Sequence, residues 1–396
     1  MDTRLFSKNF LLATLINFFI ALGYYLLIVT IAFYAMNRFG SSPGEAGLAA
    51  SIFVIGTLFG RLFAGKWGSS IGLKRTLALG LAANLWMSGF YFFCDTIPTL
   101  LLVRFLHGAG FGIASNTSAT IVVNDLPTSR YGEGLGYFML SVTVAMAIGP
   151  YIGILLGNHG HFTLIFVASA AACVLSLFIA LFLHVKDPVL NTDQINDMKG
   201  FGLRTFLEFR AIPIAIVCAI IFLCYSTILS FITPFSQEAD LVNAASFFFL
   251  VYAAVVFVAR PFMGRLFDLR GENIVFYPAI LIFAGGMVLL SQASHGYSLL
   301  ATSVLLGIGT GTIQSVGQAI AVKITPSHRL GLANSTYFIF VDIGVGLGPF
   351  LFGLIVPFAG YRGIYLYAGV ISFACVFLYY LAHGRYASPP NKKEIR

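Results

Sequence analysis

The chain repeats a pattern of glycine, proline and arginine residues at one constant offset. The segment Arg61–Gly65 (Arg-Leu-Phe-Ala-Gly) corresponds to Arg260–Gly264 (Arg-Pro-Phe-Met-Gly), so the offset is 199 residues, the difference between 61 and 260. The same offset relates Gly72 to Gly271, Gly108 to Gly307, Gly110 to Gly309, Gly112 to Gly311, Pro127 to Pro326, Arg130 to Arg329, Gly149 to Gly348 and Pro150 to Pro349. Glycine and proline each impose particular backbone geometries, so their recurrence indicates recurrent backbone structure. The chain is therefore expected to contain two copies of one unit of roughly 200 residues.

The composition excludes a soluble globular protein. Of the 396 residues, 58% are hydrophobic and only 10% are charged, whereas a soluble domain carries about 25% charged residues. Such a chain has too little polar surface to face water, so a lipid bilayer is its expected environment. The five cysteines are scattered through apolar stretches without metal-ligand spacing. We therefore expect no metal, no cofactor and no disulfide framework.

Apolar runs long enough to cross a bilayer recur along the whole chain. Six of them lie near residues 9–36, 46–65, 76–93, 98–122, 134–157 and 162–184. Six more lie near 211–235, 244–264, 274–292, 298–322, 332–356 and 363–383. The predicted fold is an all-α membrane protein with twelve transmembrane helices in two pseudo-symmetric six-helix bundles, residues 1–184 and 211–396.

A polar linker at 185–210 joins the two predicted bundles. We interpret it as an ordered connector with a short amphipathic helix at Phe201–Phe209 on the membrane surface, and a regulator-binding site is the alternative.

The distribution of basic residues predicts the orientation in the membrane. Of the 23 Lys and Arg residues, only Arg38 and Arg362 fall in outer loops and Arg104 in a span, if both termini are cytoplasmic. The other 20 then lie on the cytoplasmic side, as the positive-inside rule requires. We expect a multi-pass protein of the cell membrane, an inner or plasma membrane. The net charge of +8 is explained by topology, and no nucleic-acid partner is expected.

Two loops at equivalent positions of the repeat resemble a known family signature. The first reads Gly65-Lys-Trp-Gly-Ser-Ser-Ile-Gly72-Leu-Lys74-Arg75. It is similar to the loop signature of the major facilitator superfamily, in which a Gly is followed by an Asp, a Gly and basic residues. The second, Gly264-Arg-Leu-Phe-Asp268-Leu-Arg270-Gly271, matches more closely, because Ser69 stands at the Asp position of the first loop.

Two motifs within the spans extend this resemblance over essentially the whole chain. The fourth run contains Arg104-Phe-Leu-His-Gly108-Ala-Gly110, similar to the Arg-x-x-x-Gly-x-Gly motif of the superfamily. The fifth run is similar to the fifth-helix motif of the superfamily's proton-coupled exporters. It carries Gly136, Gly149, Pro150 and Gly153, with Ala145 in place of a second Gly.

The glycines of the fifth run permit close helix approach, and its proline permits a kink. This helix is therefore predicted to move at the boundary between the two halves. The alternative is a kink that serves packing alone. The basic residues at helix ends reach carbonyls and loop acids, which predicts gating, with a pure topology signal as the alternative. The predicted gating set is Arg61, Gly65, Lys66, Gly72, Lys74, Arg75, Gly149, Pro150, Arg260, Arg265, Asp268, Gly348 and Pro349.

Three ionisable residues lie well inside predicted spans, namely Arg104, His107 and Asp342. Such groups are unfavourable in lipid and usually face a cavity or a partner. We predict that all three take part in proton coupling and that Arg104 and His107 also bind substrate. The alternatives are an Arg104 bonded to carbonyls of the first span, a His107 held by an interhelical hydrogen bond, and an Asp342 that bonds a neighbouring helix.

Other polar and aromatic residues predict the rest of a substrate site. Arg104, His107, Phe111 and Ser115 fall on one helical stripe. The resemblance implies that spans 1, 4, 7 and 10 line the cavity, which adds Asn17, Tyr24, Tyr225, Ser226, Gln314 and Gln318, each with packing as the alternative. These spans carry no acidic residue at depth, which favours an anionic, zwitterionic or neutral substrate over a cation.

The resemblance implies a secondary transporter that works by alternating access. The predicted function is proton-coupled export of a small amphipathic drug or metabolite, and the alternative is a proton-coupled importer of a sugar or organic anion. No phosphate-binding loop of the ATPase type is present, and the span interiors lack the groups of an enzyme site, so the protein is not expected to be an enzyme. The expected partners are a small-molecule substrate, protons and lipid, and we expect a monomer.

Overall fold

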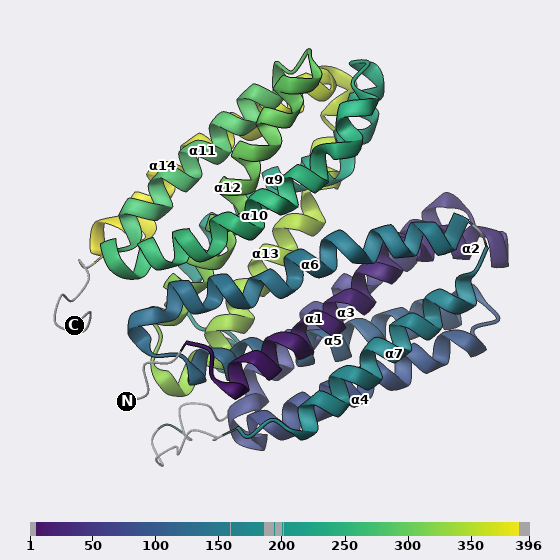
Figure 1. Ribbon diagram of the computed structural model, residues 1–396, viewed down its shortest axis with the longest axis vertical. Helices are drawn as coiled ribbons and strands as arrows, with labels where there is room; N and C mark the ends of the chain where they lie inside the picture. The colour runs from purple at the N-terminus through teal and green to yellow at the C-terminus, as the bar shows by residue number, and fades with distance from the viewer. Residues whose placement is uncertain (1–4, 159, 186–193, 195–199, 201, 388–396) are drawn as a thin grey trace. The chain divides into compact units, whose positions relative to one another are not determined.

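The structure, a computed structural model, describes residues 5–158, 160–185, 194, 200 and 202–387 (Figure 1). Within these residues all regular secondary structure is helical. Twelve of the helices are long and apolar enough to cross a membrane. The predicted all-α fold with twelve spans is therefore confirmed.

The helices of the first repeat are α1 (Lys8–Ile28), α2 (Ile31–Phe39), α3 (Pro43–Ile71), α4 (Leu73–Phe90), α5 (Ile97–Asp125), α6 (Tyr131–Asn158) and α7 (Phe162–Leu181). Those of the second repeat are α9 (Ile212–Glu238), α10 (Val242–Arg270), α11 (Glu272–Ser291), α12 (Gly296–Lys323), α13 (Leu330–Gly353) and α14 (Val356–Ala382). Short 3-10 turns include η1 (Tyr91–Phe93), η2 (Thr128–Arg130), η3 (Leu203–Thr205) and η4 (Ser327–Arg329).

Helix boundaries recur at the offset found in the sequence. The starts of four pairs of helices differ by 199 residues, namely Pro43 and Val242, Leu73 and Glu272, Ile97 and Gly296, and Tyr131 and Leu330. Gly72 and Gly271, directly before α4 and α11, have φ angles of 97° and 90°. Glycine adopts such positive φ values without the steric penalty that a side chain brings. The duplication is therefore a repeat of backbone geometry.

The contacts between residues divide the chain into two compact units that follow the repeats with one systematic exception. The first unit comprises Met1–Leu126, Ser141–Glu208 and Pro326–Thr336, and the second comprises Pro127–Leu140, Phe209–Thr325 and Tyr337–Arg396. The start of α6 thus belongs with the second repeat, and the start of α13 belongs with the first. Each of these two symmetric helices is shared between the units.

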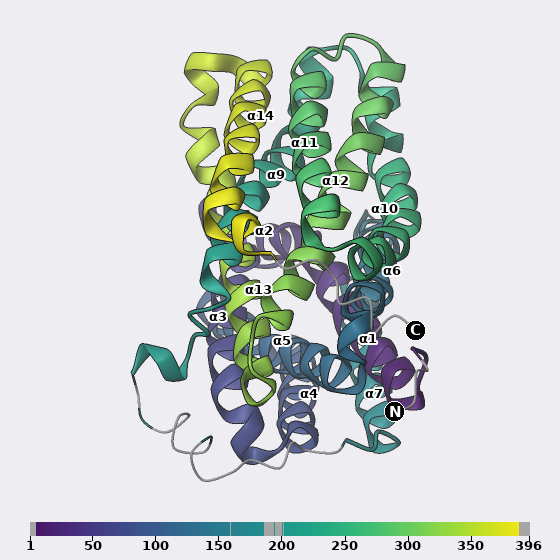
Figure 2. The same cartoon turned by 90° about the vertical axis from the view of Figure 1, so that its left-hand side faces the viewer.

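Within the units, equivalent helices pack in equivalent ways. In the first unit α5 packs against α3 and α4, and α1 packs against α7. In the second unit α12 packs against α10 and α11, and α9 packs against α14 (Figure 2). A Cβ on Gly108 of α5 would overlap the carbonyl oxygen of Phe53, and one on Gly307 of α12 would lie 3.0 Å from the carbonyl oxygen of Tyr252. Close helix approach at small residues therefore explains why these glycines recur.

Two spans differ from the apolar runs. The first run, 9–36, is broken after Ile28, where the Thr30 hydroxyl donates to the Leu26 carbonyl at 2.9 Å, and α2 begins at Ile31. The last span begins earlier than 363, at Val356, and is kinked at Gly360, which has a φ of 65°. Hydropathy alone does not register either break, because the residues on both sides are apolar.

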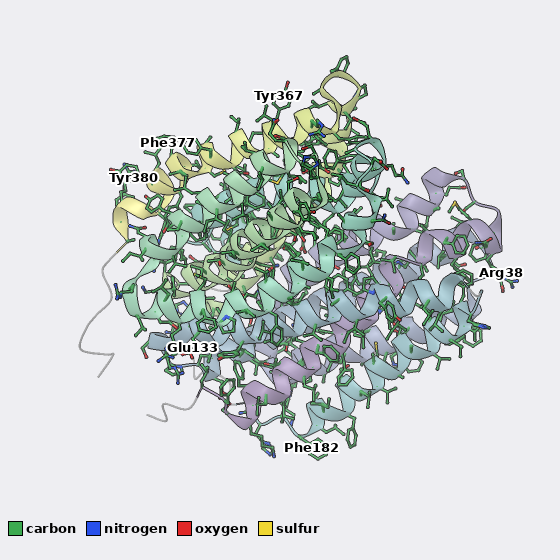
Figure 3. The ribbon with its side chains drawn as sticks, turned by 45° about the horizontal axis from the view of Figure 1, so that its top comes forward. Arg38, Glu133, Phe182, Tyr367, Phe377 and Tyr380 are labelled. Atoms are coloured by element: carbon green, nitrogen blue, oxygen red, sulfur yellow. The ribbon has the colours of Figure 1, made fainter. Side chains whose placement is uncertain are left out.

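The outer surface of the helices is apolar. Tyr367, Phe377 and Tyr380 of α14 project outward in Figure 3 and are 47%, 64% and 52% exposed. Trp86 of α4 is 68% exposed. Large exposed apolar side chains are suited to contact with lipid.

In the linker, η3 is a single 3-10 turn. It stands in place of the predicted amphipathic helix, and Phe201 lies outside the described residues.

Candidate functional site

An acidic side chain of the second repeat caps the start of α6. Asp268, near the end of α10, accepts a hydrogen bond at Oδ1 from the backbone N–H of Gly132 at 2.9 Å and at Oδ2 from that of Glu133 at 2.8 Å. The N–H groups of a first helical turn lack partners within the helix, and the helix dipole favours an anion there. The predicted gating residue Asp268 therefore caps a helix that the first repeat provides.

The start of α6 also lies backbone to backbone against α10. A Cβ on Gly132 would overlap the carbonyl oxygen of Gly264, and one on Gly264 would overlap that of Gly132. Gly136, one turn further along α6, lies in the same way against the carbonyl of Arg260. The two helices can approach this closely only because these three positions are small.

Arg260 connects three helices of the second unit. Its side chain is 5% exposed and donates to the carbonyl of Met139 in α6 at 2.6 Å. It also donates to Oε1 of Gln314 in α12. The structure thus brings together a predicted gating residue, Arg260, and a predicted substrate residue, Gln314.

The equivalent contacts in the first unit join α3 to the start of α13. The Ser335 hydroxyl donates to the carbonyl of Arg61 at 2.6 Å, and a Cβ on Gly65 would lie 2.7 Å from the Cβ of Ser335. Asn116 of α5 donates to the carbonyl of Gly331 at 3.4 Å. The start of α13 is thereby held by α3 and α5, as that of α6 is held by α10.

The remaining predicted gating residues fall into different environments. Lys66 is 6% exposed and donates to the carbonyl of Gly200 in the linker. Lys74, Arg75 and Arg265 are exposed. The side chain of Ser69, at the position where the family signature has Asp, lies outside the described residues.

The Gly-Pro pairs sit inside α6 and α13 and pack against equivalent helices. A Cβ on Gly149 would lie 2.5 Å from the Cβ of Tyr25 in α1. A Cβ on Gly348 would overlap the side chain of Ser226 and the carbonyl of Leu223 in α9. The shared helices α6 and α13 therefore carry small residues along the faces that pack on α1 and α9.

Arg104 is fully buried and bonded to backbone carbonyls. Its Nε donates to the carbonyl of Ala49 at 2.9 Å and its Nη2 to that of Ala50 at 3.4 Å. The guanidinium lies 4.6 Å from the ring centroid of Phe53. These partners belong to α3, the second span, and not to the first span considered in the sequence alternative.

His107 continues a chain of buried polar groups from Arg104. Nη1 of Arg104 donates to the hydroxyl of Tyr91 at 3.4 Å, and this hydroxyl lies 2.9 Å from Nδ1 of His107. Nε2 of His107 is 2.7 Å from Oδ1 of Asn84 in α4. The chain lies inside the first unit, which matches the interhelical alternative for His107.

Three aromatic rings lie next to this polar chain. Tyr24 of α1 stacks on Phe53 and on Phe111 of α5, with centroid separations of 5.0 and 5.4 Å. Tyr24 and Phe111 are partly exposed, whereas Phe53 is buried. Tyr24, Phe53 and Phe111 thus form an aromatic face of the first unit. The guanidinium of Arg104 contacts the ring of Phe53 within it.

The other predicted substrate residues are placed as follows. Asn17 is buried and donates to the Ser141 hydroxyl at 2.9 Å, and Ser115 is partly exposed with its hydroxyl 3.5 Å from the Gly112 carbonyl. In the second unit, Tyr225 stacks on Tyr252 at 5.9 Å. Ser226 donates to the Leu223 carbonyl at 2.6 Å, and Gln318 is fully buried in α12.

Asp342 lies near the middle of α13, which begins at Leu330 and ends at Gly353, and its side chain is half-buried. It belongs to the portion of α13 in the second unit. The third predicted ionisable residue is therefore carried by one of the two shared helices.

Several partners escaped the sequence analysis. Tyr91 and Asn84 lie in a different span from His107, and no spacing rule connects them. Glu208 contacts Arg329 from within the linker, which the sequence predicted only as an ordered connector. Glu272 binds Lys323 at 2.8 Å and also His383. Glu272, Lys323 and His383 lie at the ends of three different helices, and no spacing rule connects them either.

The Major Facilitator Superfamily model matches residues 13–298 and 242–396. An uncharacterized MFS-type transporter of Methanocaldococcus jannaschii is 22% identical, over 95% of this chain and 98% of that protein. The uncharacterized MFS-type transporter YhhS of Escherichia coli is 23% identical, over 86% of this chain and 84% of that protein. The crystal structure of the human organic anion transporter MFSD10 (TETRAN) has a TM-score of 0.75 at 13% identity, covering 93% of this chain and 98% of that one.

Proposed function

The chain belongs to the Major Facilitator Superfamily, a family of secondary transporters, and we propose that it is a proton-coupled exporter of a small amphipathic organic molecule. The observation that carries the proposal is the stripe of small residues on α6. Gly132 and Gly136 pack on α10, and Gly149 packs on α1. This helix carries the motif that resembles proton-coupled exporters, and it contacts both units.

Alternating access requires contacts that form in one state and break in another. The starts of α6 and α13 are suited to this role, because each is held by hydrogen bonds to the opposite repeat. We propose that these contacts close one side of the transporter. A helix cap is a reversible contact worth about 1 kcal/mol, so several of them can hold one state without preventing the exchange.

Proton coupling is assigned to Asp342. It is an acid near the middle of α13, a helix divided between the two units, and its side chain is half-buried. Such a group can carry a proton across only if its surroundings change with the conformational state. A carboxyl group on a helix that belongs to both units meets this requirement.

The proposed substrate surface of the first unit is the aromatic face of Tyr24 and Phe111 together with Ser115. Arg104 is proposed to position this face from behind, because its donors are engaged with carbonyls of α3. The second unit offers Gln314, which is partly exposed.

The proposed substrate is anionic, zwitterionic or neutral. The described helices α1, α5, α9 and α12 carry acidic residues only at their ends, Asp125 and Glu238, which disfavours a cationic substrate. MFSD10 is an organic anion transporter by name, but at this identity the likeness supports the fold alone.

A proton-coupled importer of a sugar or organic anion has the same fold and is the second candidate. The direction of transport and the substrate class are tested together with inverted membrane vesicles. A panel of fluorescent dyes of different charge is added outside the vesicles, and uptake of each dye is measured. We expect uptake of an anionic or neutral amphipathic dye, such as carboxyfluorescein, into inverted vesicles when their interior is acidic. Uptake by intact cells but not by inverted vesicles would favour the importer.

A further inference from the structure

The two repeats hold the starts of α6 and α13 with different anions. At α6, Asp268 caps the first turn, and Arg130 of η2 pairs with Glu133 of α6 at 2.7 Å. At the offset of 199 residues, Ser69 corresponds to Asp268, and Leu332 corresponds to Glu133. Both anions that serve α6 are therefore missing from the equivalent positions around α13.

A segment of the linker supplies polar groups at the start of α13. The Glu208 carboxylate binds Nε of Arg329, the counterpart of Arg130, and the two side chains are 5% and 10% exposed. The backbone N–H of Glu208 donates to the Thr336 hydroxyl at 2.8 Å. Arg329 also donates to the carbonyl of Arg204 at 2.7 Å. A buried pair of this kind holds its two segments together, because separating them leaves a buried charge unpaired.

The same linker segment binds Lys66 of the family signature. The Lys66 ammonium lies 4.1 Å from the centroid of the Phe206 ring and donates to the Gly200 carbonyl. Its counterpart Arg265 is exposed. The Thr205 hydroxyl closes η3 by donating to the Gly202 carbonyl at 2.8 Å. Both ends of this segment are thus tied to the first unit.

We propose that residues 202–208 form a strap that replaces the missing acid of the first signature loop. The strap fixes the start of α13 to α3 through Lys66 and Arg329, and it must release the helix when the transporter changes state. The linker then controls one of the two symmetric contacts, whereas Asp268 controls the other. This inference rests on the proposed exchange between two states, but its test needs neither a substrate nor a proton gradient.

The test is hydrogen–deuterium exchange of the full-length protein in lipid nanodiscs, followed at residues 330–336 and 131–137. Glu208→Gln removes the charge and keeps the size of the side chain. We expect it to accelerate exchange at 330–336 on the order of tenfold and to leave 131–137 unchanged. Asp268→Asn is the matched control, with the reverse pattern.

Rescue separates the strap from a general loss of packing. Ser69→Asp restores an acid at the position 199 residues before Asp268, so in the Glu208→Gln background it should bring exchange at 330–336 back to the wild-type rate. Unchanged exchange at 330–336 in Glu208→Gln, or no rescue by Ser69→Asp, would overturn the proposal. If Glu208→Gln does not yield folded protein, Phe206→Ala tests the strap through Lys66 with the same readouts. A failure here leaves the transport proposal standing.

Discussion

The carboxylate of Asp268 accepts a hydrogen bond from the backbone N–H of Gly132 at 2.9 Å, which joins the end of α10 to the start of α6. The contact links residues of different repeats inside one compact unit. It gives the acid of the signature loop a physical role, which is to neutralise the positive end of a helix dipole. The role predicts what happens when the charge is removed.

Asp268→Asn keeps one acceptor oxygen but loses the charge, so the cap should weaken by about 0.5–1 kcal/mol. We expect a larger population of the state in which the start of α6 is detached. A pair of spin labels on the start of α6 and the end of α10 measures this population by electron paramagnetic resonance. The exposed Asp95→Asn serves as control and should leave the distance distribution unchanged. Identical distributions for wild type and Asp268→Asn would exclude a gating role for this acid.

Gly348→Ala tests the packing of the second shared helix. The added Cβ would overlap Ser226 and the Leu223 carbonyl, and overpacking of this kind destabilises by about 1–3 kcal/mol. Gly346→Ala, on the same helix, is the matched control, since a Cβ there has no heavy atom within 4 Å. The melting temperature and the transport rate should both fall for Gly348→Ala. Both should stay unchanged for Gly346→Ala. Equal behaviour of the two variants would mean that α13 does not need close contact with α9.

Arg104→Gln separates a positioning arginine from one that binds substrate. The guanidinium donates to two carbonyls of α3, and a hydrogen bond to a charged group contributes about 1.5–3 kcal/mol. We therefore expect a marked fall in melting temperature, with a smaller fall in the substrate affinity of the folded protein. Arg38→Gln, at an exposed arginine, is the control. An unchanged melting temperature with lost affinity would instead make Arg104 the charge that selects the substrate.

The predicted orientation is tested by labelling single cysteines with a membrane-impermeant maleimide. The five native cysteines are buried, so the background is expected to be low. Cysteine at Glu45 should be labelled from outside in intact cells, and cysteine at Ala387 only after the membrane is opened. The opposite pattern would invert the positive-inside assignment and the direction of transport that depends on it. His159, a third useful position for the outer side, lies outside the described residues.

The fold was predictable from the sequence because it depends on repetition and hydropathy. The offset of 199 residues predicted recurrent backbone geometry at the symmetric glycines, and Gly72 and Gly271 share positive φ angles. The hydrogen bond between Arg260 and Gln314 was not predictable from the sequence. Arg260 was predicted as a gating residue and Gln314 as a substrate residue, and they lie on different helices. The hydrogen bonds from Arg104 to the carbonyls of Ala49 and Ala50 were also not predictable. Every residue has a backbone carbonyl, so the sequence does not indicate which ones accept a hydrogen bond. Glu208 was missed because its partner Arg329 lies 121 residues away.

The central claim is that substrate export is coupled to proton movement through Asp342. The direct measurement uses proteoliposomes that contain a pH-sensitive dye, with carboxyfluorescein or another substrate from the dye screen added outside. Wild-type protein should move protons in the direction opposite to the substrate, with Asp342→Glu retaining part of this flux. Asp342→Asn should bind substrate normally and move no protons. Substrate transport by Asp342→Asn at the wild-type rate, with the same proton flux, would contradict the account.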